Sequence, residues 1–330
     1  MKIKTFIICF LILVISASVN AQGFTFDKEK YQKREVVEEL RGPMPASASL
    51  KQYTPYIYPQ EYSSCVAQSF ANAMVILLAK QLGNTNKEEI SLLRPSPFFI
   101  YYTNKSATDY DCREGLDAEL TAINLLRYGV VPIMMVEYPN YYPFTNIALC
   151  KYYPPVYEDD LQMAIRPTNI YRIENLMDIK VALAGGMPVV VGMMVPESFA
   201  ACISYVWTPA FTDNIGNSYG HAMTIIGFND NIYGGSFEVM NSWGEDWGIN
   251  GYTRIRYSDA AKWIVGGWAV ERELGTSFKY DGGLAEKRED ALAPNAQMIK
   301  IFNQARQDSL IVNPFFQRDD LWEMFEKLSE

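Results

Sequence analysis

The chain has 330 residues, of which 49% are hydrophobic, and a formal net charge of −9. This size and composition exclude intrinsic disorder and predict one or two compact domains with a sizeable core. The acidic balance argues against a nucleic-acid partner, because phosphate backbones bind basic surfaces.

The first 21 residues have the three-part layout of a secretory signal peptide. Two lysines precede an apolar run from Phe6 to Ile15, and small residues lead to a cleavage site after Ala21. The apolar run is shorter than the roughly 20 residues that a membrane-spanning helix needs, so no stable membrane anchor is expected. We therefore expect a secreted or periplasmic protein, with an uncleaved anchor as the alternative.

Residues 22–43 are polar and charged, with one short helical stretch, and we interpret them as an N-terminal arm or short pro-segment. The Pro- and Tyr-rich stretch from 43 to 60 suits an extended strip, because proline removes backbone donors and blocks helix formation. A helix is predicted directly afterwards, with Ser63 and Ser64 as caps and apolar residues at helical spacing until Gly83.

The second half of the sequence changes from helical to strand patterns. Residues 116–128 predict an amphipathic helix that stops at Gly129, and a short helix is expected near 179–184. Short apolar runs bounded by Gly, Asn, Asp and Pro then predict strands at 187–195, 221–228, 237–240, 251–257 and 268–271. Helices first and sheet second predict an α+β fold with two segregated halves. Residues 272–330 return to charged, helix-prone sequence and are interpreted as a C-terminal helical appendage.

Two residues have the chemistry of a nucleophile and its base. Cys65 stands at the start of the predicted helix, where unpaired N–H groups lower a thiol pKa and bind a developing oxyanion. His221 is the single histidine, and imidazole is the usual base for an activated thiol. An inert core thiol and a satisfied structural histidine are the alternatives. One histidine and dispersed cysteines supply no metal-ligand cluster, so neither a metal nor another cofactor is expected.

A third feature is the run Asn241-Ser242-Trp243-Gly244, followed by a second Trp-Gly pair. The side-chain oxygen of Asn241 is suited to accept a hydrogen bond from one ring nitrogen of His221, which leaves the other nitrogen for sulfur. Trp243 is placed to cover that bond from water. A Trp- and Gly-rich turn between two strands is the alternative.

These residues stand in blocks that resemble the papain-like cysteine peptidase family, as a bacterial-type member. The blocks are SSCVAQSFANA, REGLDAELTAINLLRYGVVP, ALAGGMPVVVGMMV, GHAMTIIGFNDN and FEVMNSWGEDWGINGYTRIRY, in the family's order within residues 44–271. The resemblance implies a peptidase domain over that range, with a helical left half, an antiparallel β-sheet or barrel right half and an active-site cleft between them. It implies that Cys65 is the nucleophile, His221 the general base, Asn241 the orienting amide and Gln60 the oxyanion-binding glutamine.

The resemblance also implies roles for residues away from the triad. Glu114 and Gly115 fall near a Gly-rich edge that binds substrate backbone, and Trp243 is expected to border the substrate. Cys112 and Cys150 fall near family cysteines, which implies a disulfide between them; two unpaired thiols are the alternative.

We therefore expect a secreted cysteine peptidase that acts on peptide or protein substrates. The segment between Gln60 and Cys65 lacks the family's usual glycine, which favours as an alternative a catalytically inactive relative that binds a partner. An amidase or another acyl-transfer enzyme with the same Cys-His pair is the third reading.

Overall fold

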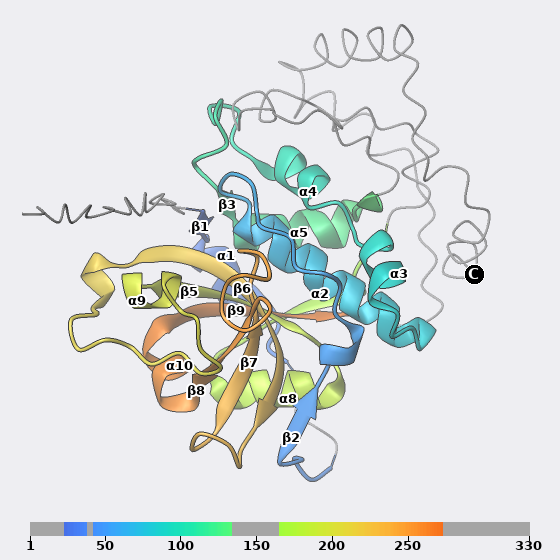
Figure 1. Cartoon of the computed structure of the whole chain (residues 1–330). Helices are drawn as coiled ribbons and strands as arrows, with labels where there is room; N and C mark the ends of the chain where they lie inside the picture. The colour runs from blue at the N-terminus through green and yellow to red at the C-terminus, as the bar shows by residue number, and fades with distance from the viewer. Residues whose placement is uncertain (1–22, 38–41, 134–164, 273–330) are drawn as a thin grey trace, which may run out of the picture.

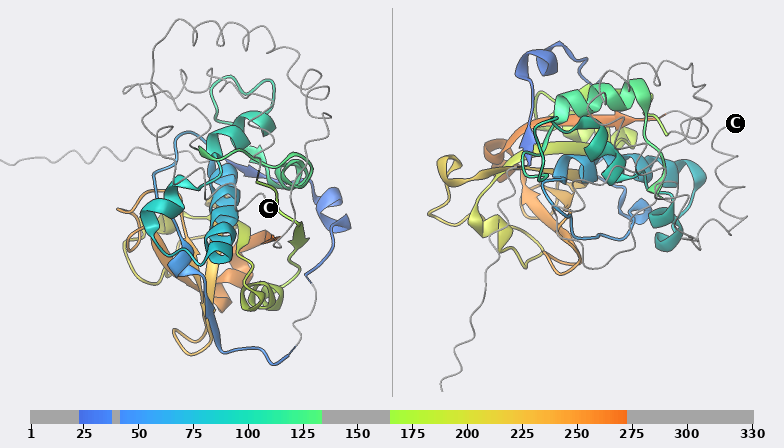
Figure 2. Two further views of the ribbon diagram at one scale, coloured as in Figure 1. Left: turned by 90° about the vertical axis from the view of Figure 1, so that its right-hand side faces the viewer. Right: turned by 90° about the horizontal axis from the view of Figure 1, so that it is seen from above.

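The computed structural model describes residues 23–37, 42–133 and 165–272. The predicted signal peptide, Cys150 and nearly all of the C-terminal appendage lie outside these ranges. Helices gather on one side of the molecule and a large antiparallel sheet on the other, which confirms the predicted α+β class (Figure 1). The views from the side and from above show α2 beside the sheet, with α3, α4 and α5 on its other side (Figure 2).

The central helix α2 (Cys65–Leu82) is buried on nearly every side and forms the core of the helical part. It ends where Gly83 takes the left-handed conformation, as predicted. By length and composition α2 is able to cross a membrane, but 78% of it is buried inside the protein, as in a core helix. The predicted capping by serine is wrong. The hydroxyl of Ser63 donates to the carbonyl of Arg113 and that of Ser64 to the carbonyl of Glu61, so neither side chain caps the helix.

Three further helices complete this side of the molecule: α3 (Lys87–Leu92), α4 (Pro97–Asn104) and α5 (Ala118–Tyr128). The helix predicted over 116–128 begins two residues late, because Leu116 and Asp117 form the short strand β3 and Asp117 then caps α5. Its end at Gly129 agrees with the prediction. Sequence patterns did not predict α3 and α4, which are short and begin at polar caps, Asn86 and Ser96.

The large sheet has seven strands in the described residues. Its order is β4-β9-β5-β6-β7-β8, with β2 paired to the end of β6 beyond β5, and every pair is antiparallel. The strands are β2 (Ser47–Ser49), β4 (Asn169–Arg172), β5 (Val189–Val195), β6 (Tyr219–Asn229), β7 (Ser236–Met240), β8 (Tyr252–Arg256) and β9 (Ile264–Glu271). Strands β5 and β6 are apolar throughout because α2 covers one face of the sheet and α8 (Leu176–Gly185) the other. The hydroxyl of Thr224 on β6 donates to the carbonyl of Ser69 on α2 at 3.0 Å, which ties the two parts together.

Short helical segments join these strands. They are α9 (Glu197–Ala200), α10 (Tyr257–Trp263) and the 3-10 turns Lys51–Tyr53 and Ile215–Asn217. Neither α10 nor the first half of β9 was predicted, because a single apolar run of 263–271 hides the change from helix to strand.

The N-terminal arm packs against both parts. Its strand β1 (Phe24–Thr25) pairs in parallel with β3 (Leu116–Asp117), and its helix α1 (Lys28–Lys33) supplies the short helical stretch expected in residues 22–43. The arm therefore runs past the N-terminal end of α2, where Cys65 stands.

Candidate active site

Cys65 is the first residue of α2 and is fully buried. Burial raises the pKa of its thiol to about 11, while the backbone N–H groups of Ala222, Val66 and Cys65 itself act in the opposite direction. Because Ala222 follows His221 along β6, this contact places the histidine's strand directly beside the thiol. The uncapped start of α2 leaves N–H groups at the sulfur, as the sequence indicated.

His221 is fully buried on β6 and bonds to Asn241. Its Nε2 lies 2.8 Å from Oδ1 of Asn241, and its Nδ1 is buried without a hydrogen-bond partner among the described residues. Burial lowers the pKa of His221 to about 4, although the bond to Asn241 favours the protonated form. A neutral ring that donates through Nε2 has its lone pair on Nδ1, which is the arrangement a proton acceptor needs.

Trp243 covers this hydrogen bond. Its ring stacks on the His221 ring at a centroid distance of 4.4 Å and an interplanar angle of 26°. The backbone N–H of Ser242 also donates to Oδ1 of Asn241 at 2.8 Å, which fixes the direction of the amide. The histidine and asparagine singled out from sequence are thus brought together in the interior, with the Trp243 ring stacked on the histidine.

Gln60 lies beside the same turn. Its backbone N–H donates to the carbonyl of Ser242 at 2.6 Å, and its Oε1 accepts from the Ser242 hydroxyl at 2.7 Å. Its Nε2 donates to the carbonyl of Tyr62 at 3.1 Å and keeps a second N–H. Tyr62 has a φ of 44°, a left-handed turn that carries the chain from Gln60 to Cys65 without the glycine that the family uses.

The strip that contains Glu114 and Gly115 is organised by Asp109. Oδ1 of Asp109 accepts from the backbone N–H groups of Arg113 and Glu114, and the Glu114 side chain is exposed. Gly115 is buried with a φ of +77°, and a Cβ there would stand 2.3 Å from the backbone of Gly23. Cys112 is disulfide-bonded. Its expected partner, Cys150, lies outside the described residues, so that pairing stays a prediction.

The sequence suggested an arm or short pro-segment over residues 22–43 but did not indicate which residues cover the thiol. A Cβ on Gly23 would stand 2.9 Å from Sγ of Cys65, and the carbonyl of Gly23 accepts from the N–H of Leu116 at 3.1 Å. Residues 23–26, which we call the plug, therefore lie across the nucleophile. The signal in the sequence was slight: two phenylalanines at the start of an otherwise charged arm.

The side chain of Phe24 fills a space that two glycines leave open. A Cβ at Gly192 would meet the tip of the Phe24 ring at 1.9 Å, and one at Gly220 would meet the Phe24 carbonyl oxygen at 2.8 Å. The ring packs edge-on against Trp268 at a centroid distance of 6.0 Å. Phe24 is only 9% exposed, although it belongs to the first described strand of the chain.

Among the described residues, no group of three or more His, Cys, Asp or Glu side chains could hold a metal ion. Cys202, the other free thiol described, lies against Thr253 and Ser204, away from this site.

Comparison with known proteins finds papain-family relatives. The model of the papain family cysteine proteases matches residues 105–266, a range that holds His221 and Asn241 and begins after Cys65. A curated relative, the uncharacterized peptidase C1-like protein L477 of Acanthamoeba polyphaga mimivirus, is 30% identical over 215 residues. Over these ranges the chain is similar to the papain family of cysteine proteases. That alignment covers 60% of this chain and 63% of the relative's length.

Solved structures of papain-like proteins share the fold. Xylellain, a cysteine protease from Xylella fastidiosa, superposes with a TM-score of 0.60 at 21% identity, over 76% of this chain and 96% of xylellain. Procathepsin B S9 from Trypanosoma congolense superposes with a TM-score of 0.56 at 17% identity, over 77% of this chain and 87% of that protein. The predicted two-part papain-like architecture is therefore confirmed.

Proposed function

We propose that this papain-like protein is a cysteine peptidase in which Cys65 attacks the peptide carbonyl and His221 transfers the proton. The observation that supports this best is the state of His221. Its Nε2 lies 2.8 Å from Oδ1 of Asn241, and its Nδ1 is buried with no hydrogen-bond partner among the described residues. The next residue on the same strand, Ala222, contacts the Cys65 thiol through its N–H. A structural histidine usually has both ring nitrogens satisfied when it is buried.

The proposed reaction has two halves. His221 takes the thiol proton, and Sγ of Cys65 bonds to the carbonyl carbon of the substrate, with the developing oxyanion near the Cys65 N–H and the Gln60 amide. The C–N bond then breaks, and the proton on His221 goes to the amine that leaves. Water, deprotonated by His221, attacks the thioester and releases the carboxylic acid together with the Cys65 thiol.

The proposal includes latency, because the plug lies across the nucleophile. In this covered state burial holds the thiol pKa near 11 and the imidazole pKa near 4, so both groups are neutral at pH 7. A neutral thiol reacts slowly, since the thiolate is the nucleophile. Exposure of the site to water on release of the plug relieves the desolvation of both groups and favours the thiolate–imidazolium pair.

Export is part of the same proposal and rests on the N-terminal sequence alone. Cleavage after Ala21 would leave Gln22 as the first residue, directly before the plug. We infer that the protein is secreted or periplasmic and that it acts there on peptides or proteins.

The test uses the purified protein in two forms, the chain from residue 22 and a chain shortened to begin at Asp27. A thiol-directed epoxide inhibitor is expected to label the shortened form at Cys65, and peptide turnover under reducing conditions is expected in the same form. Cys65→Ala is the control for labelling and His221→Ala for turnover. If the shortened form shows neither labelling nor turnover, the inactive-relative reading replaces the peptidase proposal.

A further inference from the structure

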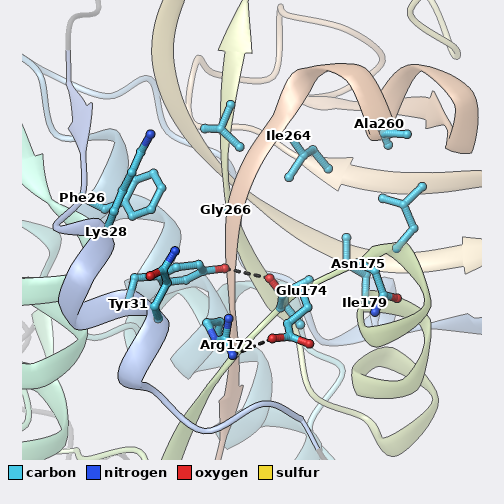
Figure 3. Close-up of a pocket in the computed structure, with 15 residues that line it drawn as sticks. Phe26, Lys28, Tyr31, Arg172, Glu174, Asn175, Ile179, Ala260, Ile264 and Gly266 are labelled. Carbon is cyan, nitrogen blue, oxygen red and sulfur yellow. Dashed lines mark hydrogen bonds and ion pairs between the residues drawn. The ribbon is translucent and has the colours of Figure 1, made fainter.

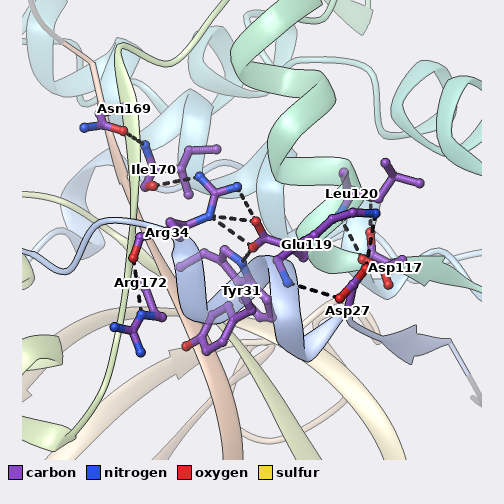
Figure 4. A network of polar contacts seen from close by, with 12 residues as sticks. Asp27, Tyr31, Arg34, Asp117, Glu119, Leu120, Asn169, Ile170 and Arg172 are labelled. Atoms are coloured by element: carbon purple, nitrogen blue, oxygen red, sulfur yellow. Dashed lines mark hydrogen bonds and ion pairs between the residues drawn. The ribbon is translucent and has the colours of Figure 1, made fainter.

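The N-terminal arm consists of two parts that are held by different interactions. The plug, residues 23–26, pairs its backbone with β3 and inserts the Phe24 ring beside Trp268. The remainder, residues 27–37, which we call the anchor, contains α1 and the segment after it. The anchor packs against α5 and the edge of the large sheet (Figure 4).

A buried ion pair dominates the anchor. Nε and Nη2 of Arg34 bond to the carboxylate of Glu119 on α5 at distances of 2.7 to 3.1 Å, and Nη1 donates to the carbonyl of Ile170 at 2.9 Å. The side chains of Arg34 and Glu119 are only 8% and 2% exposed. Removal of one partner from a buried pair leaves an uncompensated charge in the interior, which is among the most costly changes a fold undergoes.

Tyr31 adds a second buried attachment. Its hydroxyl lies 2.8 Å from the carbonyl oxygen of Ile173 and 3.0 Å from that of Gly267, and it accepts from the N–H of Gly267 at 2.9 Å. These are backbone groups at and beside the sheet, and they lose the Tyr31 hydroxyl if α1 departs, although the carbonyl of Gly267 keeps the N–H of Ile173 at 3.0 Å. The pocket beside α1, about 620 Å³ in volume, is lined by Tyr31 together with Arg172 of β4 and Ile264 of β9, so the anchor forms one wall of it (Figure 3).

The anchor also protects the edge of the large sheet. Val36 bridges in parallel to Arg172, the N–H of Arg172 donates to the carbonyl of Glu35 at 2.7 Å, and the N–H of Val37 donates back to the carbonyl of Arg172 at 3.4 Å. Since β4 is the outermost strand on this side, the anchor covers backbone groups that would otherwise form an exposed edge.

The two parts of the arm meet at Trp268. Its indole N–H donates to Oε2 of Glu119 at 2.9 Å, and Glu119 is in turn held by Arg34. The same ring packs edge-on against Tyr31 at 5.0 Å and forms the surface on which Phe24 lies. Arg34 thus fixes, through Glu119, a wall of the space beside the nucleophile.

We propose that residues 27–37 remain in place in the active enzyme, with Arg34 as a positioning residue for Trp268, and that only residues 23–26 leave the site. This inference deepens the proposed function and rests on it, because it assumes that the protein has an active state. Its physical basis is independent of turnover. Departure of the plug leaves no buried charge unpaired, whereas departure of the anchor would leave the buried carboxylate of Glu119 without Arg34.

The experiment compares the chain that begins at Asp27 with an Arg34→Met variant of the same shortened chain. Lys33→Met is the matched control, since Lys33 is an exposed cation on the same helix. Relative to the chain from residue 22, the shortened chain is expected to remain cooperatively folded and to lose only the stability that burial of the plug supplies, and Arg34→Met is expected to lower the Tm of the shortened chain by about 10 °C. Lys33→Met is expected to leave Tm unchanged.

A second readout reports on the site and needs no catalysis. The reaction of Cys65 with a chromogenic disulfide reagent is measured in the shortened chain, with the blocked peptide Gly-Phe-Thr-Phe added as a protecting ligand. Arg34→Met is expected to raise the peptide concentration needed for half protection by about tenfold, because the wall against which Phe24 packs is no longer fixed. A merely stabilising role for Arg34 would lower Tm and leave protection unchanged, which would overturn the positioning role.

If Arg34→Met does not fold, Tyr31→Phe carries the same test, because it removes only the hydroxyl bonds to the sheet. A lower Tm and weaker protection in Tyr31→Phe support the proposal, and no change in either measurement overturns it. Failure of the chain that begins at Asp27 to fold, or a fully stable and active species that begins after residue 37, also overturns the proposal. Because protection and Tm do not depend on turnover, an absence of peptidase activity with these results intact rejects the proposed function alone.

Discussion

The Phe24→Ala substitution tests directly whether the plug controls access to the nucleophile. Phe24 is 9% exposed and packs against Trp268 at 6.0 Å and Phe26 at 5.7 Å. Burial of a phenylalanine side chain stabilises by about 1.5–3 kcal/mol, which corresponds to roughly 10- to 150-fold in the closed-to-open ratio of the plug. Because the plug is a short tail, this change weakens local closure, and the loss of global stability does not exceed the free energy of that closure.

The assay is the rate at which Cys65 reacts with a chromogenic disulfide reagent under native conditions. A Cys202→Ser background removes the other free thiol that the structure describes, and Cys65→Ala gives the blank. Thr25→Ala is the matched control, because the Thr25 side chain is exposed while its backbone pairs with β3. We expect at least a tenfold faster reaction for Phe24→Ala and no change for Thr25→Ala. Equal rates in Phe24→Ala and the parent protein would refute the idea that this ring holds the site closed.

Three other predictions follow from the same site. Gly192→Val is expected to expel the Phe24 ring and expose the thiol, because a Cβ at this position would stand 1.9 Å from that ring. The measurement is protection of Cys65 by the Gly-Phe-Thr-Phe peptide, which should be lost. Protection at the level of the parent protein would contradict the prediction. Because burial lowers the pKa of His221 from 6.5 to about 4, the folded state loses stability as pH falls through this window, by about 3 kcal/mol. Urea unfolding from pH 7 to pH 4 measures this loss, and a His221→Gln variant with the same pH slope would contradict it. Asn241→Ala removes a buried hydrogen bond from the imidazole and is expected to lower kcat/KM of the plug-free chain by about 10- to 100-fold; unchanged kinetics would remove Asn241 from the mechanism.

The sequence predicted the central parts of the fold because their local signals agree with their tertiary environment. The helix at Cys65 and its end at Gly83 follow from apolar spacing and a glycine that takes positive φ, and the strand after Gly220 follows from an apolar run buried on both faces. Short elements such as α3 and α4 escaped prediction because their boundaries depend on single capping residues.

The candidate site was predictable to the extent that its residues carry unusual chemistry. His221, Asn241 and Trp243 come together as expected, because a lone histidine and an Asn-Ser-Trp-Gly run stand out from any background. The plug and the Arg34–Glu119 pair did not stand out. They depend on contacts between residues far apart along the chain, 42 positions for Gly23 and Cys65 and 85 for Arg34 and Glu119, and no local pattern indicates such contacts.

Because β1 pairs with β3, the plug occupies the site as an intramolecular ligand, and the anchor tethers it there. A segment held a few residues from its binding surface acts at an effective concentration of about millimolar. Any peptide from outside must compete with it, so weakly binding molecules are rejected and only a tight ligand, or cutting of the tether, keeps the site open. The arm thus sets the minimum affinity that a peptide needs to reach Sγ of Cys65.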